Sequence, residues 1–195
     1  AIPSEGQSMA ERLKEKQKEA QKKSIIDFSF HAQITRWDQD MSAEMEEVLK
    51  MGICSFKIFM PATEGWGVDS AGLFEALKKA RSLDSIVMVH AENGEIAEYL
   101  TENLVKEGKT KMTDYPFARP AFIEKLAVTR AAMVADEAKA PIYICHLSTK
   151  EAAMQISGMK KEGYRIYAET TPQYLTLENK IFEEKNGYLF ACCPP

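Results

Sequence analysis

The chain has 195 residues, of which 45% are hydrophobic and 28% are charged, a balance typical of one globular domain. Its formal net charge of −4 leaves no basic surplus for phosphate contacts, so nucleic acid and anionic membranes are poor partners and a small molecule is the expected one. The sequence has no apolar run of membrane-spanning length and no secretory signal pattern, which makes the cytoplasm the expected location.

Short apolar, β-branched runs alternate with helical patterns along the chain. The runs predict strands at residues 25–31, 53–59, 86–90, 142–146 and 164–169, and a sixth at 188–192. Apolar residues at helical spacing predict helices over 8–23, 41–49, 73–80, 123–134 and 152–159. Capping-box spacing in the pairs Ser8–Glu11 and Ser148–Glu151 predicts two helix starts, and Gly52, Gly108 and Gly163 stand where helices are expected to end.

This alternation leaves two architectures, the doubly wound sheet and the (β/α)8 TIM barrel. The chain has no glycine-rich nucleotide-binding turn after a strand, which favours the barrel. A complete barrel needs eight strands and about 250 residues, whereas only five or six βα units are visible in this sequence. We therefore expect residues 1–195 to be part of a single (β/α)8 barrel, excerpted from a longer protein with missing strands on both sides.

The three histidines, His31, His90 and His146, all stand at the carboxyl ends of predicted strands. In a β/α barrel the active site is built at this end, because the βα loops converge there. Imidazole is a common ligand for zinc-like metals, so the histidines are candidate metal ligands. The alternative for each is a hydrogen-bonded structural residue.

Lys57 lies in a run that otherwise predicts a buried strand, where an unpaired ammonium group is costly. It could reach solvent at the end of the barrel or pair with a carboxylate. Alternatively, burial could favour the neutral amine, which is a nucleophile and can be chemically modified. Periodicity does not decide between these interpretations.

Several segments of the chain, taken together and in order, resemble the signature segments of the dihydropyrimidinase and hydantoinase family of the amidohydrolase superfamily. Allantoinases and dihydroorotases share much of the pattern. The segments are Ser55-Phe-Lys-Ile-Phe-Met60, His90-Ala-Glu-Asn-Gly94, Arg119-Pro120, His146-Leu-Ser148, Glu169-Thr-Thr-Pro-Gln-Tyr-Leu175 and Pro194-Pro195.

The resemblance implies a cyclic amidohydrolase with a binuclear metal centre, usually of zinc, in the full-length protein. Lys57 would react with carbon dioxide to form a carbamate that bridges two divalent metal ions, and His90 and His146 would bind one of them. Metal-activated hydroxide would then open a cyclic amide or imide such as a dihydropyrimidine or hydantoin. Cys193 would contact the substrate through its backbone. Relatives are commonly homotetramers, and His31 matches no ligand, which leaves it a structural role.

The departures from the family pattern also matter. The paired histidines of the first strand and the aspartate of the last strand would lie outside this chain, so we expect these 195 residues alone to be inactive. Ala62 replaces a tyrosine that would stabilise the developing oxyanion. Glu92, Asn93 and Glu169 are expected to orient loops. The alternatives are an allantoinase- or dihydroorotase-type enzyme and a non-catalytic scaffold, as in the collapsin-response mediator proteins.

Overall fold

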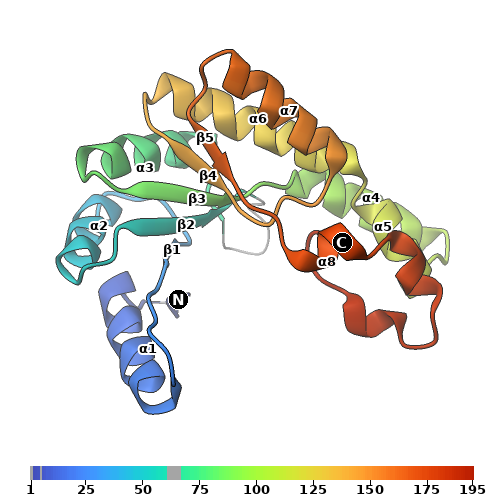
Figure 1. Ribbon diagram of the computed structural model, residues 1–195, viewed down its shortest axis with the longest axis horizontal. Helices are drawn as coiled ribbons and strands as arrows, with labels where there is room; N and C mark the ends of the chain where they lie inside the picture. Colours follow the sequence, from blue (N-terminus) through green and yellow to red (C-terminus); the bar gives the residue numbers. More distant parts are fainter. Residues whose placement is uncertain (1, 5, 61–66) are drawn as a thin grey trace.

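The computed structural model describes residues 2–4, 6–60 and 67–195. Its centre is a five-stranded parallel sheet in the order β1-β2-β3-β4-β5, in which every strand pairs with the next one along the chain (Figure 1). The strands are β1 (Ala32–Ile34), β2 (Ser55–Phe59), β3 (Ile86–His90), β4 (Ile142–Ile144) and β5 (Ile166–Ala168). Sequential parallel pairing is the topology that consecutive βα units of a barrel produce.

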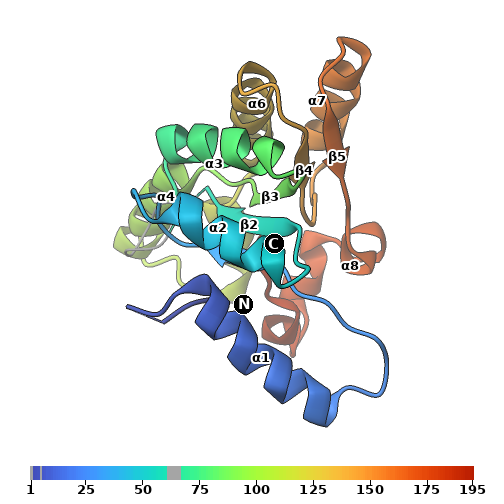
Figure 2. The ribbon, with the colours of Figure 1, turned by 90° about the vertical axis from the view of Figure 1, so that its left-hand side faces the viewer.

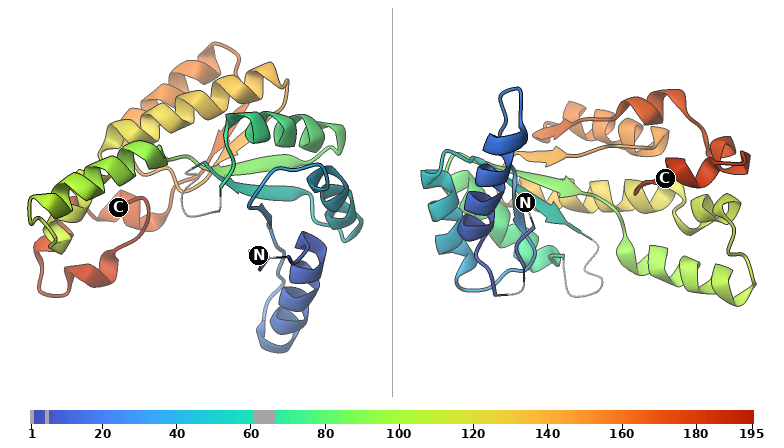
Figure 3. Two further views of the ribbon diagram at one scale, coloured as in Figure 1. Left: turned by 180° about the vertical axis from the view of Figure 1, so that it is seen from behind. Right: turned by 90° about the horizontal axis from the view of Figure 1, so that it is seen from below.

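The helices form two groups around the sheet. The connections between strands include α2 (Met41–Lys50), α3 (Ser70–Ser82), α4 (Gly94–Lys106), α5 (Tyr115–Ala118), α6 (Ala121–Glu137) and α7 (Lys150–Lys161). Of these, α2, α3, α6 and α7 cover the convex face of the sheet, whereas α4 and α5 lie beyond its carboxyl end together with α8 (Pro172–Thr176) (Figures 1 and 3). Within the described residues, no helix combines the length and the apolar character needed to cross a membrane.

The first helix, α1 (Met9–Lys23), begins at the Ser8–Glu11 capping box that the sequence predicts. Most of its surface is charged, but Met9 and Leu13 are buried. The helix packs along α2 and β1, to one side of the other helices (Figure 2). It is therefore attached to the sheet through one narrow apolar stripe.

The two faces of the sheet differ in character. Alternate side chains point outward and are fully buried under the helices, among them Phe56, Val87, Ile142 and Ile144. The strand register places the others in one row on the inner face, namely Gln33, Lys57, Met88, Tyr143 and Tyr167. This row is less buried, and Tyr167 is 55% exposed. Lys57 thus belongs to the inner face of the sheet and not to the core beneath the helices.

The predicted strand at 25–31 is wrong. These residues form an irregular segment in which Ile25 is 98% exposed, and the strand is β1, immediately after it. Pairing decides the boundary, because only Ala32, Gln33 and Ile34 have partners on β2. His31 therefore precedes a strand instead of ending one.

The predicted sixth strand at 188–192 is also wrong, since Gly187–Phe190 forms a 3-10 helix. Its backbone bonds are local, from Leu189 N to Asn186 O and from Ala191 N to Tyr188 O, so no strand ladder forms there.

Of two other predictions of helix boundaries, the glycines at helix ends are confirmed and the cap at the start of α7 is wrong. Gly52, Gly108 and Gly163 follow helices with φ of +84°, +73° and +99°, as expected, but Thr149 caps α7 in place of Ser148.

Candidate metal centre

His90 is the last residue of β3 and is only 4% exposed. The β2–β3 register places it beside Phe59, and the two rings stack with centroids 4.9 Å apart. Its two ring nitrogens face different neighbours. Nδ1 lies 3.2 Å from His146 Nε2, and Nε2 lies 3.5 Å from Glu92 Oε2.

His146 follows β4 by two residues, and its backbone adopts φ +38°, a conformation that non-glycine residues seldom take. Burial, and then the positive charge of Lys57 and the proximity of His90, lower the pKa of His146 to about 4. The ring is therefore neutral at pH 7, which is the form that binds metals. Its Nδ1 is buried without a hydrogen-bond partner on any other described residue.

Lys57 lies between these histidines and the middle of the inner face. Its Nζ is 3.5 Å from His146 Nε2 and 5.2 Å from the centre of the Phe59 ring. The side chain is half-buried, and in the described part of the chain it forms no ion pair with a carboxylate. The structure thus brings Lys57, in the middle of β2, together with His90 and His146 at the carboxyl ends of β3 and β4.

Cys193 approaches the other side of His90. Its Sγ lies 3.5 Å from Glu92 Oε2 and 4.0 Å from His90 Nε2. Cys193 is exposed as a residue, but partial desolvation of its thiol group, together with the nearby Glu92 carboxylate, raises the pKa of Cys193 to about 12. The neighbouring backbone is fixed by two tyrosines, since Tyr115 donates to Cys192 O at 2.6 Å and Tyr174 donates to Pro194 O at 2.8 Å.

The sequence predicts only that Glu92 orients a loop, but its side chain also contacts His90 and Cys193. It is 2% exposed, and together with His90 and Cys193 it forms a group whose potential ligand atoms all lie within 4.8 Å of one another. Burial alone would raise its pKa, but the contacts with His90 and with the Arg119 guanidinium outweigh this effect and hold the pKa of Glu92 below its ordinary value. It is therefore an anion positioned behind His90.

The remaining predicted residues have simpler positions. His31 Nδ1 lies 2.7 Å from the hydroxyl of Ser55, the first residue of β2, at the end of that strand away from His90. Asn93 caps α4 by accepting from Ile96 N, and Glu169 accepts from the Tyr143 hydroxyl. Ala62, which replaces the tyrosine expected from the family pattern, lies outside the described residues.

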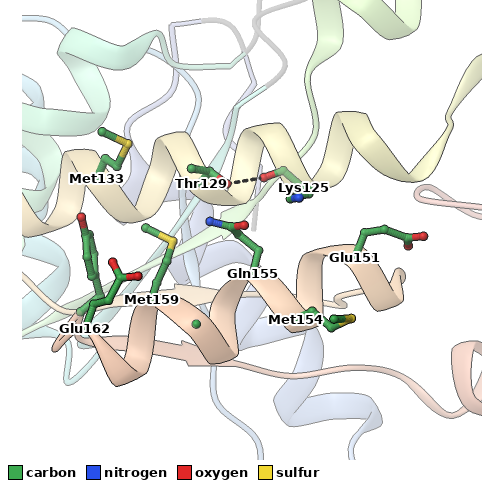
Figure 4. Close-up of a pocket in the computed structure, with 10 residues that line it drawn as sticks. Lys125, Thr129, Met133, Glu151, Met154, Gln155, Met159 and Glu162 are labelled. Carbon is green, nitrogen blue, oxygen red and sulfur yellow. Dashed lines mark hydrogen bonds between the residues drawn. The ribbon is translucent and has the colours of Figure 1, made fainter.

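A groove of about 580 Å³ lies between α6 and α7 (Figure 4). Its walls include Met133, Met154 and Met159, with Thr129 and Gln155 between them. It belongs to the outer helical layer, and none of the predicted site residues lines it. The groove is therefore separate from the candidate metal centre.

Comparison with known proteins places the chain in a family. The dihydro-orotase-like family profile matches residues 11–152. A D-hydantoinase of Geobacillus stearothermophilus is 31% identical over 197 residues, which cover 100% of this chain and 42% of that protein. A dihydropyrimidinase of Dictyostelium discoideum is 35% identical over 86% of this chain and 34% of its own length.

The fold agrees with this assignment. The crystal structure of a dihydropyrimidinase from Brevibacillus agri superposes with a TM-score of 0.94 at 32% identity, covering 98% of this chain and 42% of that one. The five βα units therefore match part of a hydantoinase-type TIM barrel, as the sequence predicts, and the chain spans about two fifths of the length of such relatives. The chain belongs to the dihydro-orotase-like family, among relatives that are hydantoinases and dihydropyrimidinases.

Proposed function

We propose that the full-length protein is a metal-dependent hydrolase that opens a cyclic amide or imide, and that His90, His146 and Lys57 form part of its metal centre. The observation that carries the proposal is the approach of His90 Nδ1 to within 3.2 Å of His146 Nε2, with Lys57 Nζ 3.5 Å from the same Nε2. The hydantoinase and dihydropyrimidinase relatives support the reaction class.

The two histidines fit a divalent, zinc-like ion. The low pKa of His146 leaves its Nε2 lone pair available at neutral pH, and this lone pair faces His90 Nδ1. The other nitrogen of His90 faces Glu92, which fixes the ring orientation and leaves Nδ1 for the metal. When bound, such an ion lowers the pKa of water and polarises a carbonyl group.

We propose that Lys57 carries a carbamate in the working enzyme. The ammonium group would first lose a proton, and the neutral amine would then attack carbon dioxide, forming an N–C bond and releasing a second proton. This converts a cation beside two histidines into an anion suited to bridging two metal ions. The absence of a carboxylate partner for Lys57 in the described part of the chain supports this role, since no ion pair must be broken first.

We propose that the substrate ring lies beside Cys193 and contacts its backbone, which Tyr115 and Tyr174 hold on either side. The remaining metal ligands would come from the parts of the full-length protein outside these residues. The 195-residue chain alone would then have no appreciable turnover. A homotetramer remains our prediction for the assembly, to be tested by light scattering of the full-length protein.

The experiment is to measure metal content and ring-opening turnover in the full-length protein, with dihydrouracil, hydantoin, allantoin and dihydroorotate as substrates. We expect about two metal ions per chain and turnover of at least one substrate. Lys57→Ala should abolish both turnover and full metal occupancy, whereas the control Lys78→Ala, on the exposed surface of α3, should change neither. Unchanged turnover in Lys57→Ala would refute the mechanism. A metal-free, inactive wild-type protein would favour the non-catalytic scaffold.

A further inference from the structure

The short segment 119–124, which runs from the end of α5 into the first turn of α6, makes buried polar contacts in two directions; we call it the brace. At its first residue, the Arg119 guanidinium forms an ion pair with Glu92 and lies 5.8 Å from the centre of the Tyr115 ring. Glu92 is buried and stands two residues after His90, at the start of the β3–α4 loop. This end of the brace therefore holds the loop that directly follows His90.

At the other end of the brace, Glu124 holds the loop that carries His146. Glu124 is 4% exposed, and each of its carboxylate oxygens accepts two hydrogen bonds. Oε1 accepts from the backbone N and hydroxyl of Ser148 at 2.9 and 3.1 Å, and Oε2 accepts from the backbone N and hydroxyl of Thr149 at 2.9 and 2.5 Å. A buried carboxylate with four donors is fully satisfied and rigidly placed.

The conformation of His146 shows why its loop needs such an anchor. Its φ of +38° costs on the order of 1–3 kcal/mol and persists only where the surroundings enforce it. The four bonds to Glu124 fix the two residues that begin the turn into α7, immediately after Leu147. Pro120, with φ −68°, stiffens the connection between the two ends of the brace.

We propose that the brace is a positioning element that sets the distance between His90 and His146. Arg119 acts through Glu92 on His90, and Glu124 acts through Ser148 and Thr149 on His146. Because both ends lie in one short segment at the junction of α5 and α6, the loop that follows His90 and the loop that contains His146 share a single support. This inference rests on the proposed function, since the distance matters only if the two histidines hold one metal ion.

The test uses the full-length protein with five variants and measures Co²⁺ affinity and the visible absorption of bound Co²⁺. Glu124→Gln and Arg119→Met should each weaken Co²⁺ binding about 10- to 100-fold and alter the spectrum, since loss of groups that orient metal ligands has effects of this size. The matched controls are Glu151→Gln and Lys125→Met, exposed residues on α7 and α6, which should retain wild-type affinity. Arg119→Lys, which keeps the charge, should recover part of the loss.

Two further variants separate the possible failures. Ser148→Ala removes one bond to Glu124 and should weaken Co²⁺ binding less than Glu124→Gln, which keeps the test valid if the latter does not fold. His146→Ala should abolish tight binding if the proposed function is correct. Wild-type affinity and spectrum in the folded brace variants, with binding lost in His146→Ala, would overturn the brace alone. Tight binding retained in His146→Ala would overturn the proposed function and the brace with it.

Discussion

Replacing Arg119 by methionine should destabilise the metal-free, full-length protein by about 3 kcal/mol at pH 7. The substitution leaves Glu92, which is 2% exposed, without its cationic partner. Breaking a buried ion pair from one side costs about 3–5 kcal/mol. Protonation of Glu92 limits the loss, because a carboxyl group of ordinary pKa near 4.3 takes up a proton at pH 7 at a cost of about 3.7 kcal/mol.

The same reasoning fixes how the loss depends on pH. Without Arg119, the pKa of Glu92 in the folded state should rise above its unfolded value. The loss in free energy of unfolding is then greatest above the raised pKa of Glu92 and becomes smaller as the pH falls toward the unfolded pKa. At pH 5.5, protonation of Glu92 limits this loss to about 1.6 kcal/mol. Urea unfolding of the chelator-treated protein at both pH values measures this. In a Glu92→Gln background, Arg119→Met should cost less than about 1 kcal/mol. An equal loss at both pH values, or an undiminished loss in that background, would refute the reasoning.

Three further predictions concern the core and the candidate centre. Phe56→Ala should lower the free energy of unfolding by about 3–5 kcal/mol because the ring is fully buried. Met154, on α7, is 64% exposed, so Met154→Ala should lower it by under about 0.5 kcal/mol. Similar losses for the two variants in urea unfolding would contradict this. The pKa of His146 is about 4 in the folded protein and about 6.5 in the unfolded chain, so between these pH values a proton binds to the unfolded chain and not to the folded protein. The metal-free protein should therefore lose stability as the pH falls from about 6.5 toward 4. This loss should be smaller in His146→Asn. Cys193, with a pKa near 12, should react with iodoacetamide at pH 8 at least roughly tenfold more slowly than free cysteine although the residue is exposed, and an equal rate would show that its surroundings do not raise the pKa of the thiol.

The sequence was most informative where a strand and its helices form a regular repeat. Residues 86–90 form β3 with the predicted bounds, because a continuous β-branched run fits a strand buried on both faces. The same criterion was misleading at 25–31, where Ile25 and Ile26 are exposed and the true strand contains Gln33. Apolar composition does not reveal which residues find a partner strand, and pairing with β2 decided that boundary.

The candidate centre could be predicted only in part. Lys57, His90 and His146 were found from their places on predicted strands and from family resemblance, and the structure brings their side chains together. The contacts of Arg119 and Glu124 could not be predicted, because they join residues 27 and 24 positions apart and depend on how α6 packs. No local pattern encodes such pairings. Ser148 illustrates the same limit, since its predicted capping partner Glu151 is replaced by Glu124.

Metal analysis of the full-length protein tests the central claim most directly. The account predicts about two zinc-like ions per chain in the wild type. It predicts that His146→Ala loses the ion held between His90 and His146, whose ring nitrogens lie 3.2 Å apart. A wild-type protein that binds no metal, or a His146→Ala variant that retains the full wild-type metal content, would contradict it.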